Sequence, residues 1–458
     1  MIKEQFRKYL VEAIGEERSL IAFAAFEKPA SVSVRINPFK PCPQPSDARP
    51  VAWSRHGFLL NERPVFTLDP HFHGGAYYVQ DSSSMFVGEV FRKLICDVEV
   101  PENRPVRVLD LCAAPGGKST DLASSLRDIF GDRFILVTNE VMKQRVGILA
   151  DNMALWGDPN VVVTSDDPSA FSVLNGFFDV IVADVPCSGE GMFRKDEDAQ
   201  NQWSEDNVAL CASRQRRIVA DVWPALRQGG LFIYSTCTFN TYENDGNVQW
   251  IADELGAVPL LRQDLIGGEG VIKTDLGYSL VPGFVEGEGQ YCSALKKTSD
   301  NEWSGGFKDS RKKARPSGPA VKIPDGLEGL FNIPMDLRLR GEMVIAVPKA
   351  LVADVAMLDQ MHVIASGCAV GAVKGRDLVP DADLALSLAL AQDAYPSVEV
   401  DRQTALSYLH RDAIILKDSP KGYILIRYEG LPLGFVKNLG NRCNSLHPQS
   451  RRIRMDIK

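Results

Sequence analysis

The chain has 458 residues, a length that allows about two to four domains. Its hydrophobic share of 45% and charged share of 24% are typical of a globular protein. No apolar run approaches the roughly 18 residues that a membrane-spanning helix needs. The formal net charge is −8, so the overall charge does not indicate nucleic-acid binding, although local basic patches can still contact phosphate.

Cysteine and histidine usage narrows the chemistry further. The nine cysteines are odd in number and scattered, and no two of them have the CxxC spacing of a zinc ribbon or a thioredoxin-type site. The six histidines all lie outside residues 74–361, so the middle of the chain uses no histidine base or histidine-ligated metal. His71 and His73 lack a third ligand nearby, and we expect no metal site. The start of the chain shows no apolar signal segment, which favours a reducing, cytoplasmic setting.

The first hundred residues predict a small α+β domain. Residues 1–30 have the pattern of two amphipathic helices, and residues 31–38 then alternate like a strand. Residues 76–85 mix aromatic and polar side chains before another helix, which Asp81 or Ser82 could cap. This last segment is either a packed connector or the entrance to a ligand site.

Residues 100–298 predict a doubly wound α/β domain, because apolar runs alternate with helical patterns. Its first strand leads into the turn Pro115-Gly116-Gly117, after which helix formers resume. Glycines let a ligand approach the backbone, and the helix start offers free N–H groups. The turn lacks Walker A spacing and the full dinucleotide fingerprint, so on its own it is equally consistent with an ordinary βα turn. The strand candidates are residues 106–111, 134–138, 160–164, 178–183 and 230–235.

Acidic residues follow successive strands of this domain. Glu140 comes just after the second strand, where a carboxylate can accept hydrogen bonds from both hydroxyls of a ribose. Asp166 and Asp167 follow the third strand, and one of them could bind an adenine amino group. Each could instead cap a helix, but their regular placement favours one shared ligand. A ribose-binding acid, then a base-binding acid, then the catalytic strand is the order that an S-adenosylmethionine site needs. A phosphate site would need a basic group and free amides, and Lys118 is the only basic residue in these turns.

Two cysteines lie at one edge of the predicted sheet. Cys187 follows the strand candidate 178–183, and Cys237 follows the candidate 230–235. Either alone could be a core cysteine, but both lie in polar turns just beyond apolar strands, where open α/β sheets bind their ligands. Cys112, inside the glycine turn, is more consistent with a small packing residue.

A cysteine pair of this kind suits methylation of cytosine at C5. That carbon is a poor nucleophile until a thiolate adds to C6 and pushes electron density onto it. After methyl transfer, the C5 proton must leave and the thiolate must be expelled. We expect Cys237, Cys187 and Asp184 to supply the activated thiol, the group that helps release and the acid that supports N3.

These motifs closely resemble those of the Sun-type (RsmB/RsmF) family of RNA cytosine-C5 methyltransferases, which use S-adenosylmethionine as cofactor. The resemblance rests on residues 112–118, 184–189 and 235–237. It implies that Cys237 is the nucleophile and that Cys187 assists product release. The cofactor positions that it implies are Cys112, Ala113, Ala114, Pro115, Gly116, Gly117, Lys118, Glu140, Asp167 and Asp184.

The resemblance extends toward both ends of the chain. Residues 33–38 and 75–81 are similar to the family's N-terminal RNA-side segment, and residues 431–437 and 444–448 to the PUA-like part of the RsmF-like bacterial branch. The fold class implied is a Rossmann-like α/β core with a small α+β domain before it and a β-rich module after it. The expected organisation is an RNA-binding-like domain at 1–99, a catalytic domain at 100–298, a linker at 299–320 and a separate PUA-like region at 321–458.

The function implied is formation of 5-methylcytosine in a structured RNA. The branch favours small-subunit (16S) rRNA over tRNA, with the rRNA or the small ribosomal subunit as partner, and we expect a monomer. Two other classes stay open: a methyltransferase acting on a protein or small molecule, and a non-catalytic RNA-binding protein of ribosome assembly with a vestigial site.

Overall fold

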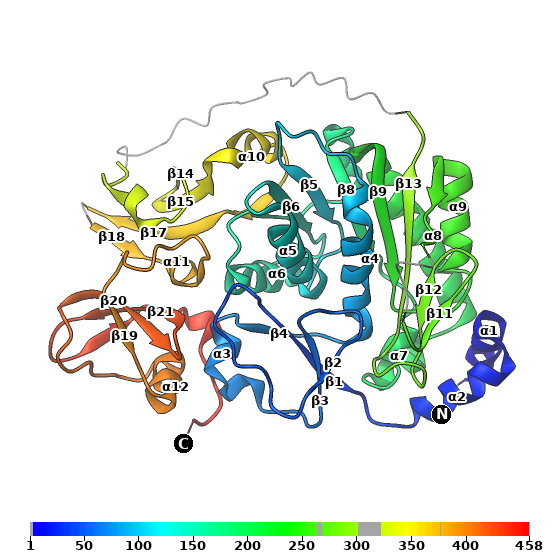
Figure 1. The fold of residues 1–458 in the computed structure, drawn as a ribbon, viewed down its shortest axis with the longest axis horizontal. Coiled ribbons are helices and arrows are strands. Elements are labelled where there is room, and N and C mark those ends of the chain that lie inside the picture. Colours follow the sequence, from blue (N-terminus) through cyan, green and yellow to red (C-terminus); the bar gives the residue numbers. More distant parts are fainter. Residues whose placement is uncertain (1–2, 263–267, 301–321, 376, 458) are drawn as a thin grey trace.

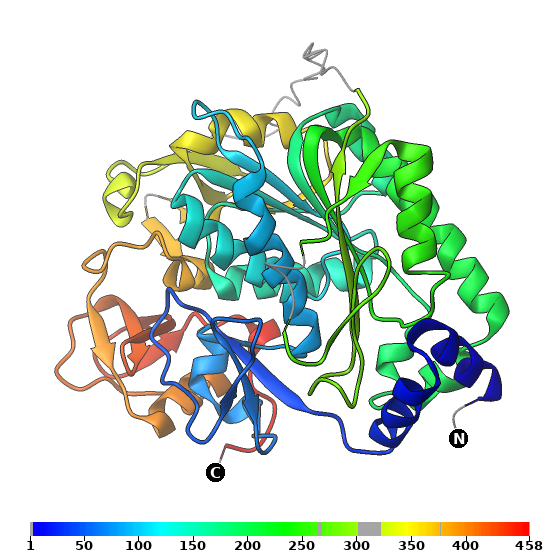
Figure 2. The ribbon, with the colours of Figure 1, turned by 45° about the vertical axis from the view of Figure 1, so that its right-hand side comes forward.

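The computed structural model describes residues 3–262, 268–300, 322–375 and 377–457, and a central sheet of ten strands organises it (Figure 1). The described residues also form a four-stranded sheet near the N-terminus and two four-stranded sheets in the C-terminal region. Figure 2 shows the N-terminal sheet and the last sheet side by side. None of the described helices has the length and apolar character needed to cross a membrane.

The N-terminal residues form the two predicted helices and a sheet of order β2-β3-β1-β4. His71 and His73 lie in one helical turn. Pro70 begins that turn, and the Asp69 carboxylate caps it by accepting a hydrogen bond from the His71 N–H. The elements are α1 (Glu4–Ile14), α2 (Glu16–Phe26), β1 (Val32–Ile36), β2 (Arg49–Pro50), β3 (Gly57–Leu60), α3 (Pro70–His73) and β4 (Tyr77–Val79).

Five parallel strands at the heart of the central sheet confirm the five strand candidates. Their spatial order is β7-β6-β5-β8-β9, so the order reverses between β5 and β8. Ligands of open α/β sheets bind at the carboxyl ends of the strands beside such a reversal. The strands are β5 (Val106–Asp110), β6 (Phe134–Asn139), β7 (Val161–Thr164), β8 (Phe178–Asp184) and β9 (Leu226–Thr236); the antiparallel side adds β10 (Ala257–Pro259), β11 (Val271–Lys273), β12 (Tyr278–Leu280) and β13 (Gln290–Lys297).

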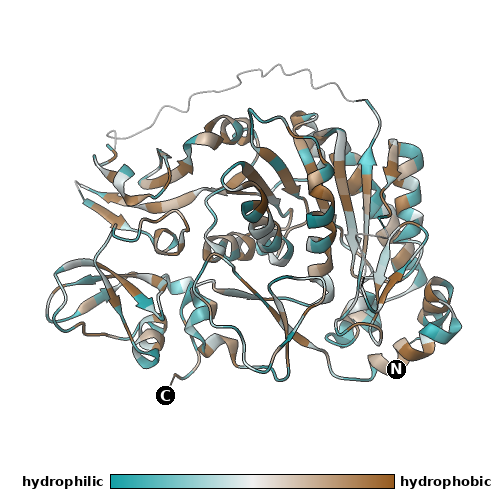
Figure 3. Ribbon diagram, in the orientation of Figure 1, coloured by the Kyte–Doolittle hydropathy of each residue, from teal (hydrophilic) through white to brown (hydrophobic). Residues whose placement is uncertain are grey.

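Helices cover both faces of this sheet. Along β6, Phe134 and Leu136 pack with helices of one face, whereas Ile135 and Val137 pack with those of the other. Strands buried on both faces read as continuous apolar runs, which is why the sequence located them (Figure 3). On one face lie α4 (Phe86–Leu94), α5 (Gly117–Phe130) and α6 (Lys143–Trp156), and on the other lie α8 (Glu205–Val222) and α9 (Asp245–Leu255); α7 (Glu197–Gln202) precedes α8.

The described C-terminal residues form two sheets, of order β14-β15-β17-β18 and β19-β20-β21-β22. Their strands are β14 (Met335–Arg340), β15 (Met343–Pro348), β17 (Cys368–Lys374), β18 (Asp377–Pro380), β19 (Ser397–Glu399), β20 (Gly422–Tyr428), β21 (Leu431–Asn438) and β22 (Cys443–Ser445). Their helices are α10 (Val352–Leu358), α11 (Ala382–Leu386) and α12 (Arg402–His410).

One strand of this region joins the catalytic sheet. β16 (Val363–Ser366) pairs antiparallel with β7 and covers what would otherwise be an open edge. The expectation of a fully separate C-terminal module is therefore wrong for this strand. Most of the predicted linker at 299–320 lies outside the described residues.

Candidate active site

The glycine turn between β5 and α5 is held by neighbouring elements. Gly116 has φ of +115°, in the left-handed region that favours glycine. Two side chains of α6 fix the carbonyls before it: Arg145 Nη2 donates to Ala114 O at 2.6 Å, and Asn152 Nδ2 donates to Pro115 O at 2.7 Å. The turn is thus a rigid cradle beside the α5 N-terminus, with Lys118 in the first turn of that helix.

Asp110, the last residue of β5, was not singled out from the sequence. Its carboxyl is fully buried, and Oδ2 accepts a hydrogen bond of 2.6 Å from Ser119 Oγ. Oδ1 has no hydrogen-bond partner among the described residues. Burial raises the pKa of Asp110 to about 7, against the opposing effect of the Ser119 hydrogen bond. An acidic residue at the end of a strand, before a glycine turn, was the signal that could have located it.

The other predicted cofactor acids lie at the ends of the next strands. Glu140 follows β6 and is nearly buried, with Oε1 accepting the Met142 N–H at 2.9 Å. Asp167 caps the short helix that follows it by accepting the Ser169 N–H at 3.1 Å. Asp166 accepts the His362 N–H just before β16. The structure brings Glu140 and the Asp166–Asp167 pair to neighbouring strand ends, as predicted, and Asp167 also has the capping geometry of the alternative interpretation.

The two cysteine turns meet at the ends of β8 and β9. These strands are adjacent and parallel, and Asp184 is in register with Ser235. As a result, Cys187 Sγ and Cys237 Sγ lie 2.9 Å apart, and both thiols are free. The hydrogen bond with Cys237 and burial raise the pKa of Cys187 well above its usual value. Cys187 therefore holds its proton more firmly than an ordinary thiol does, and either sulfur can act as the donor in this contact.

Asp184 lies at the centre of a polar cluster beside the cysteines. Its Oδ1 accepts hydrogen bonds from Ser235 Oγ at 2.7 Å and from Gln290 Nε2 at 3.1 Å. Its Oδ2 lies 2.9 Å from Lys118 Nζ. Burial alone would lower the pKa of Lys118, but the charge of Asp184 and its hydrogen bond raise it, with the charge of Cys237 adding to the effect. A lasting positive charge therefore lies between the glycine turn and the cysteines.

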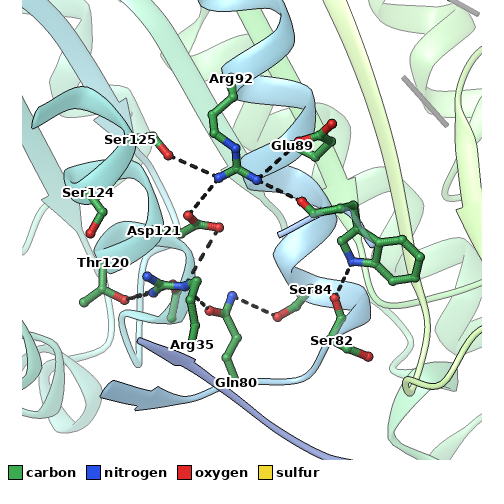
Figure 4. Close-up of polar contacts among 12 residues, drawn as sticks. Arg35, Gln80, Ser82, Ser84, Glu89, Arg92, Thr120, Asp121, Ser124 and Ser125 are labelled. Atoms are coloured by element: carbon green, nitrogen blue, oxygen red, sulfur yellow. Dashed lines mark hydrogen bonds and ion pairs between the residues drawn. The ribbon is translucent and has the colours of Figure 1, made fainter. Parts of the chain in front are cut away.

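The N-terminal sheet contacts the glycine turn through Arg35 (Figure 4). This fully buried side chain donates from Nη2 to Gly117 O at 3.1 Å and to Thr120 Oγ1 at 2.5 Å. Its Nε donates to Gln80 Oε1 at 2.9 Å. Residues 76–85, left open as connector or entrance, thus act at least as a support for the turn.

Family models match three parts of the chain. The model described as 16S rRNA methyltransferase RsmB/F matches residues 99–296, the N-terminal domain of 16S rRNA methyltransferase RsmF matches 2–82, and the methyltransferase RsmF PUA domain matches 395–453. The chain belongs to the RsmB/F methyltransferase family. The resemblance found from the motifs is thereby confirmed.

Curated relatives match over almost the whole chain. "Ribosomal RNA small subunit methyltransferase F" of Enterobacter sp. (strain 638) is 28% identical, over 97% of this chain and 95% of the relative. The protein of the same name from Escherichia coli (strain SE11) is 29% identical with the same coverage. This member of the RsmB/F family is an S-adenosylmethionine-dependent RNA methyltransferase.

Solved structures agree on the fold. A methyltransferase homologue from Pyrococcus horikoshii, 26% identical, covers 64% of this chain and 95% of its own, with a TM-score of 0.53. NSun6 from Pyrococcus horikoshii with SFG, 17% identical, covers 65% of this chain and 99% of its own, with a TM-score of 0.50. The Rossmann-like core that the motifs predicted is thus confirmed.

Proposed function

We propose that this RsmB/F enzyme forms 5-methylcytosine in 16S rRNA, with Cys237 as nucleophile. The observation that carries the proposal is the 2.9 Å contact between the sulfur atoms of Cys187 and Cys237 at the ends of adjacent parallel strands. The 16S rRNA as substrate follows from the names of the matching family model and relatives. Methylation of an amine or an oxygen needs no such thiol pair.

The residues at the glycine turn fit S-adenosylmethionine. The buried, unpartnered Oδ1 of Asp110 suits the α-ammonium of the methionine part, because an ammonium donates and carries the opposite charge. Glu140 would accept the ribose hydroxyls, and Asp167 the adenine amino group. Residues 112–118 would cradle the ligand. When bound, the cofactor supplies an electrophilic methyl group as a sulfonium.

The cysteine chemistry then follows in three steps. The Cys237 thiolate adds to C6 and forms an S–C6 bond, which places electron density on C5. C5 would then take the methyl group, whose bond to the cofactor's sulfur breaks with the electron pair staying on that sulfur, while Asp184 supports the N3 side of the ring. The C5 proton then leaves to water, the S–C6 bond breaks and its electron pair returns to Cys237. The Cys187 S–H donates a hydrogen bond to the departing sulfur and thereby helps release.

The target cytosine must leave the base stack of the RNA before this reaction begins. C6 of a stacked base is out of reach of a side chain, so the target cytosine must be flipped into the pocket. The N-terminal domain and the PUA domain are the parts of the chain that would grip the surrounding RNA. Two finer points belong to the proposal: a cytoplasmic location, which suits nine free cysteines, and a monomer, which gains its RNA contacts from its own appended domains.

A covalent-adduct assay tests this proposal. We would incubate Cys187→Ala with S-adenosylmethionine and either 16S rRNA or small ribosomal subunits, beside wild type and the Cys187→Ala/Cys237→Ala double variant. We expect a slowly migrating protein–RNA adduct in the single variant and none in the double variant, and sequencing of the trapped RNA would identify the cytosine. A folded, cofactor-binding Cys187→Ala that gives no adduct with either substrate would overturn the two-cysteine mechanism. An adduct that forms only when tRNA is supplied as a third substrate would overturn the choice of RNA.

A further inference from the structure

Glu243 is a buried carboxylate beneath the two cysteine turns, and the steps above do not use it. It lies between β9 and α9 and is 0% exposed. Its Oε2 accepts the Ser188 N–H at 3.0 Å and a hydrogen bond from Gln215 Nε2 at 2.7 Å. Its Oε1 accepts a hydrogen bond from Asn240 Nδ2 at 2.8 Å. Three donors thus converge on one carboxylate.

These donors hold the Cys187 turn from both sides. The Ser188 N–H belongs to the peptide bond that directly follows Cys187. Gln215 Nε2, which Glu243 orients, also donates to the carbonyl oxygen of Pro186 at 3.0 Å. The residues before and after Cys187 are therefore fixed to the same carboxylate, one directly and one through Gln215.

The same carboxylate is joined to the Cys237 turn. Asn240 Nδ2 donates to Thr238 Oγ1 at 2.9 Å as well as to Glu243. Thr238 Oγ1 lies 3.0 Å from Ser188 Oγ, so the residues following the two cysteines also bond to each other. The hydrogen bonds of Glu243 therefore connect the two cysteine turns and fix their position relative to each other.

We propose that Glu243 is a positioning residue that holds the Cys187 thiol against the Cys237 sulfur for the release step. This inference rests on the proposed two-cysteine chemistry and adds a residue to it. Release needs the Cys187 S–H within hydrogen-bond reach of the departing sulfur, while attack and methyl transfer need only Cys237. Loss of Glu243 therefore slows release more than attack.

A carboxylate suits this position better than an amide. Both of its oxygens face N–H donors, so a glutamine would set its own NH₂ group against a donor on one side. Burial raises the pKa of Glu243 to about 7, with the hydrogen bonds from Ser188 and Asn240 opposing the shift. The charge of Glu190 also raises the pKa of Glu243. The charge of Glu243 in turn raises the pKa of Cys187, Cys211 and Tyr234.

The test compares adduct lifetimes in full-length variants. We would measure adduct formation, adduct decay and cofactor affinity for Glu243→Gln, Glu243→Asp and the matched control Asp179→Asn. Asp179 is an equally buried carboxylate on the same strand as Asp184, but at its other end, where it pairs with Arg104 and Arg227. Cys187→Ala serves as the reference for an enzyme that attacks but does not release.

We expect Glu243→Gln to accumulate the adduct as Cys187→Ala does, with release slowed roughly 100-fold and cofactor affinity unchanged. Glu243→Asp keeps the acceptors and should restore part of the release rate. Asp179→Asn should lower the melting temperature without trapping the adduct. If Cys187→Ala traps RNA but Glu243→Gln does not, or if Glu243→Gln loses attack and release equally, the positioning role is overturned. If Cys187→Ala itself traps nothing, the underlying two-cysteine mechanism has failed instead.

Discussion

Lys118 Nζ lies 2.9 Å from Asp184 Oδ2 and links the first turn of α5 to the end of β8. Its positive charge also faces Cys237. The charges of Asp184 and Cys237 both raise the pKa of Lys118, although burial lowers it. One cation thus serves both the carboxylate and the proposed nucleophile.

Lys118→Met should slow formation of the covalent adduct at neutral pH. Without the cation, the Cys237 thiolate loses a stabilising positive charge, so the rate of adduct formation at pH 7 should fall ~10-fold. Adduct formation in the Cys187→Ala background, followed from pH 6 to pH 10, measures this. Lys118→Arg keeps the charge and should keep a rate close to that of the parent; an unchanged rate in Lys118→Met would confine the role of the lysine to Asp184.

Asp110→Asn should change how the stability of the cofactor-free protein depends on pH. Burial raises the pKa of Asp110 from its usual 3.8 to about 7. Between these values the unfolded state has lost the proton and the folded state still holds it, so stability falls as the pH rises through this window. The shift corresponds to at most about 4 kcal/mol. The variant, which keeps an acceptor for Ser119, should lose this fall.

Urea unfolding at pH 5 and pH 8 measures the effect of Asp110→Asn. Glu243 titrates in the same window in both proteins, so the difference between them isolates Asp110. The same variant should bind S-adenosylmethionine roughly 10- to 100-fold more weakly at pH 8, because a charged acceptor is lost. Unchanged affinity would remove Asp110 from the ammonium site.

The strands were predictable because strands buried on both faces appear in the local sequence as continuous apolar runs. β6 and β8 are buried on both faces, and the turns that follow β5, β6, β8 and β9 carry the glycines, acids and cysteines of the site. Asp110 was not predicted although its place before the glycine turn was a usable signal. Glu243 was not predicted because its importance comes from the groups that face it rather than from a motif. Nor was β16 predicted. It pairs with β7 some 200 positions earlier, and a short half-buried strand carries little local signal.

Arg35→Met should weaken both the fold and the glycine turn. The substitution leaves the amide oxygen of Gln80 without its donor and removes one of the two donors to the carbonyl of Gly117. Removal of one buried charge of such a cluster costs on the order of 3 kcal/mol. Because Gly117 belongs to the proposed cofactor cradle, affinity for S-adenosylmethionine should fall as well. Urea unfolding and calorimetric cofactor titration measure the two effects.

Arg92→Met is the matched control for Arg35→Met. Arg92 belongs to the same cluster and pairs with Asp121, but it contacts neither Gly117 nor Thr120 (Figure 4). It should therefore lower stability while leaving cofactor affinity close to wild type. Equal losses of affinity in both variants would show that the cluster acts only through overall stability.

A chain truncated after residue 300 should aggregate although it contains the whole predicted catalytic domain. Removal of β16 exposes the edge of β7, and unpaired edge strands are templates for association. The truncation also uncovers the apolar surface on which Leu351, Val355 and Leu358 pack, and it removes the Asp354 partner of Arg107. Size-exclusion chromatography and thermal unfolding would show this against the full chain.

Arg451→Met in the full chain is the control that separates the loss of β16 from a general loss of contacts between the C-terminal region and the catalytic domain. Arg451 pairs with Asp151 of α6 and with Asp383 of α11, so the substitution loosens the C-terminal region while β16 stays in place. That variant should remain monodisperse with a lower melting temperature. If the truncated chain were as soluble and as stable as the full one, β16 would not be needed for the stability of the catalytic sheet. If the truncated chain alone aggregates, this strand is a structural part of the catalytic domain.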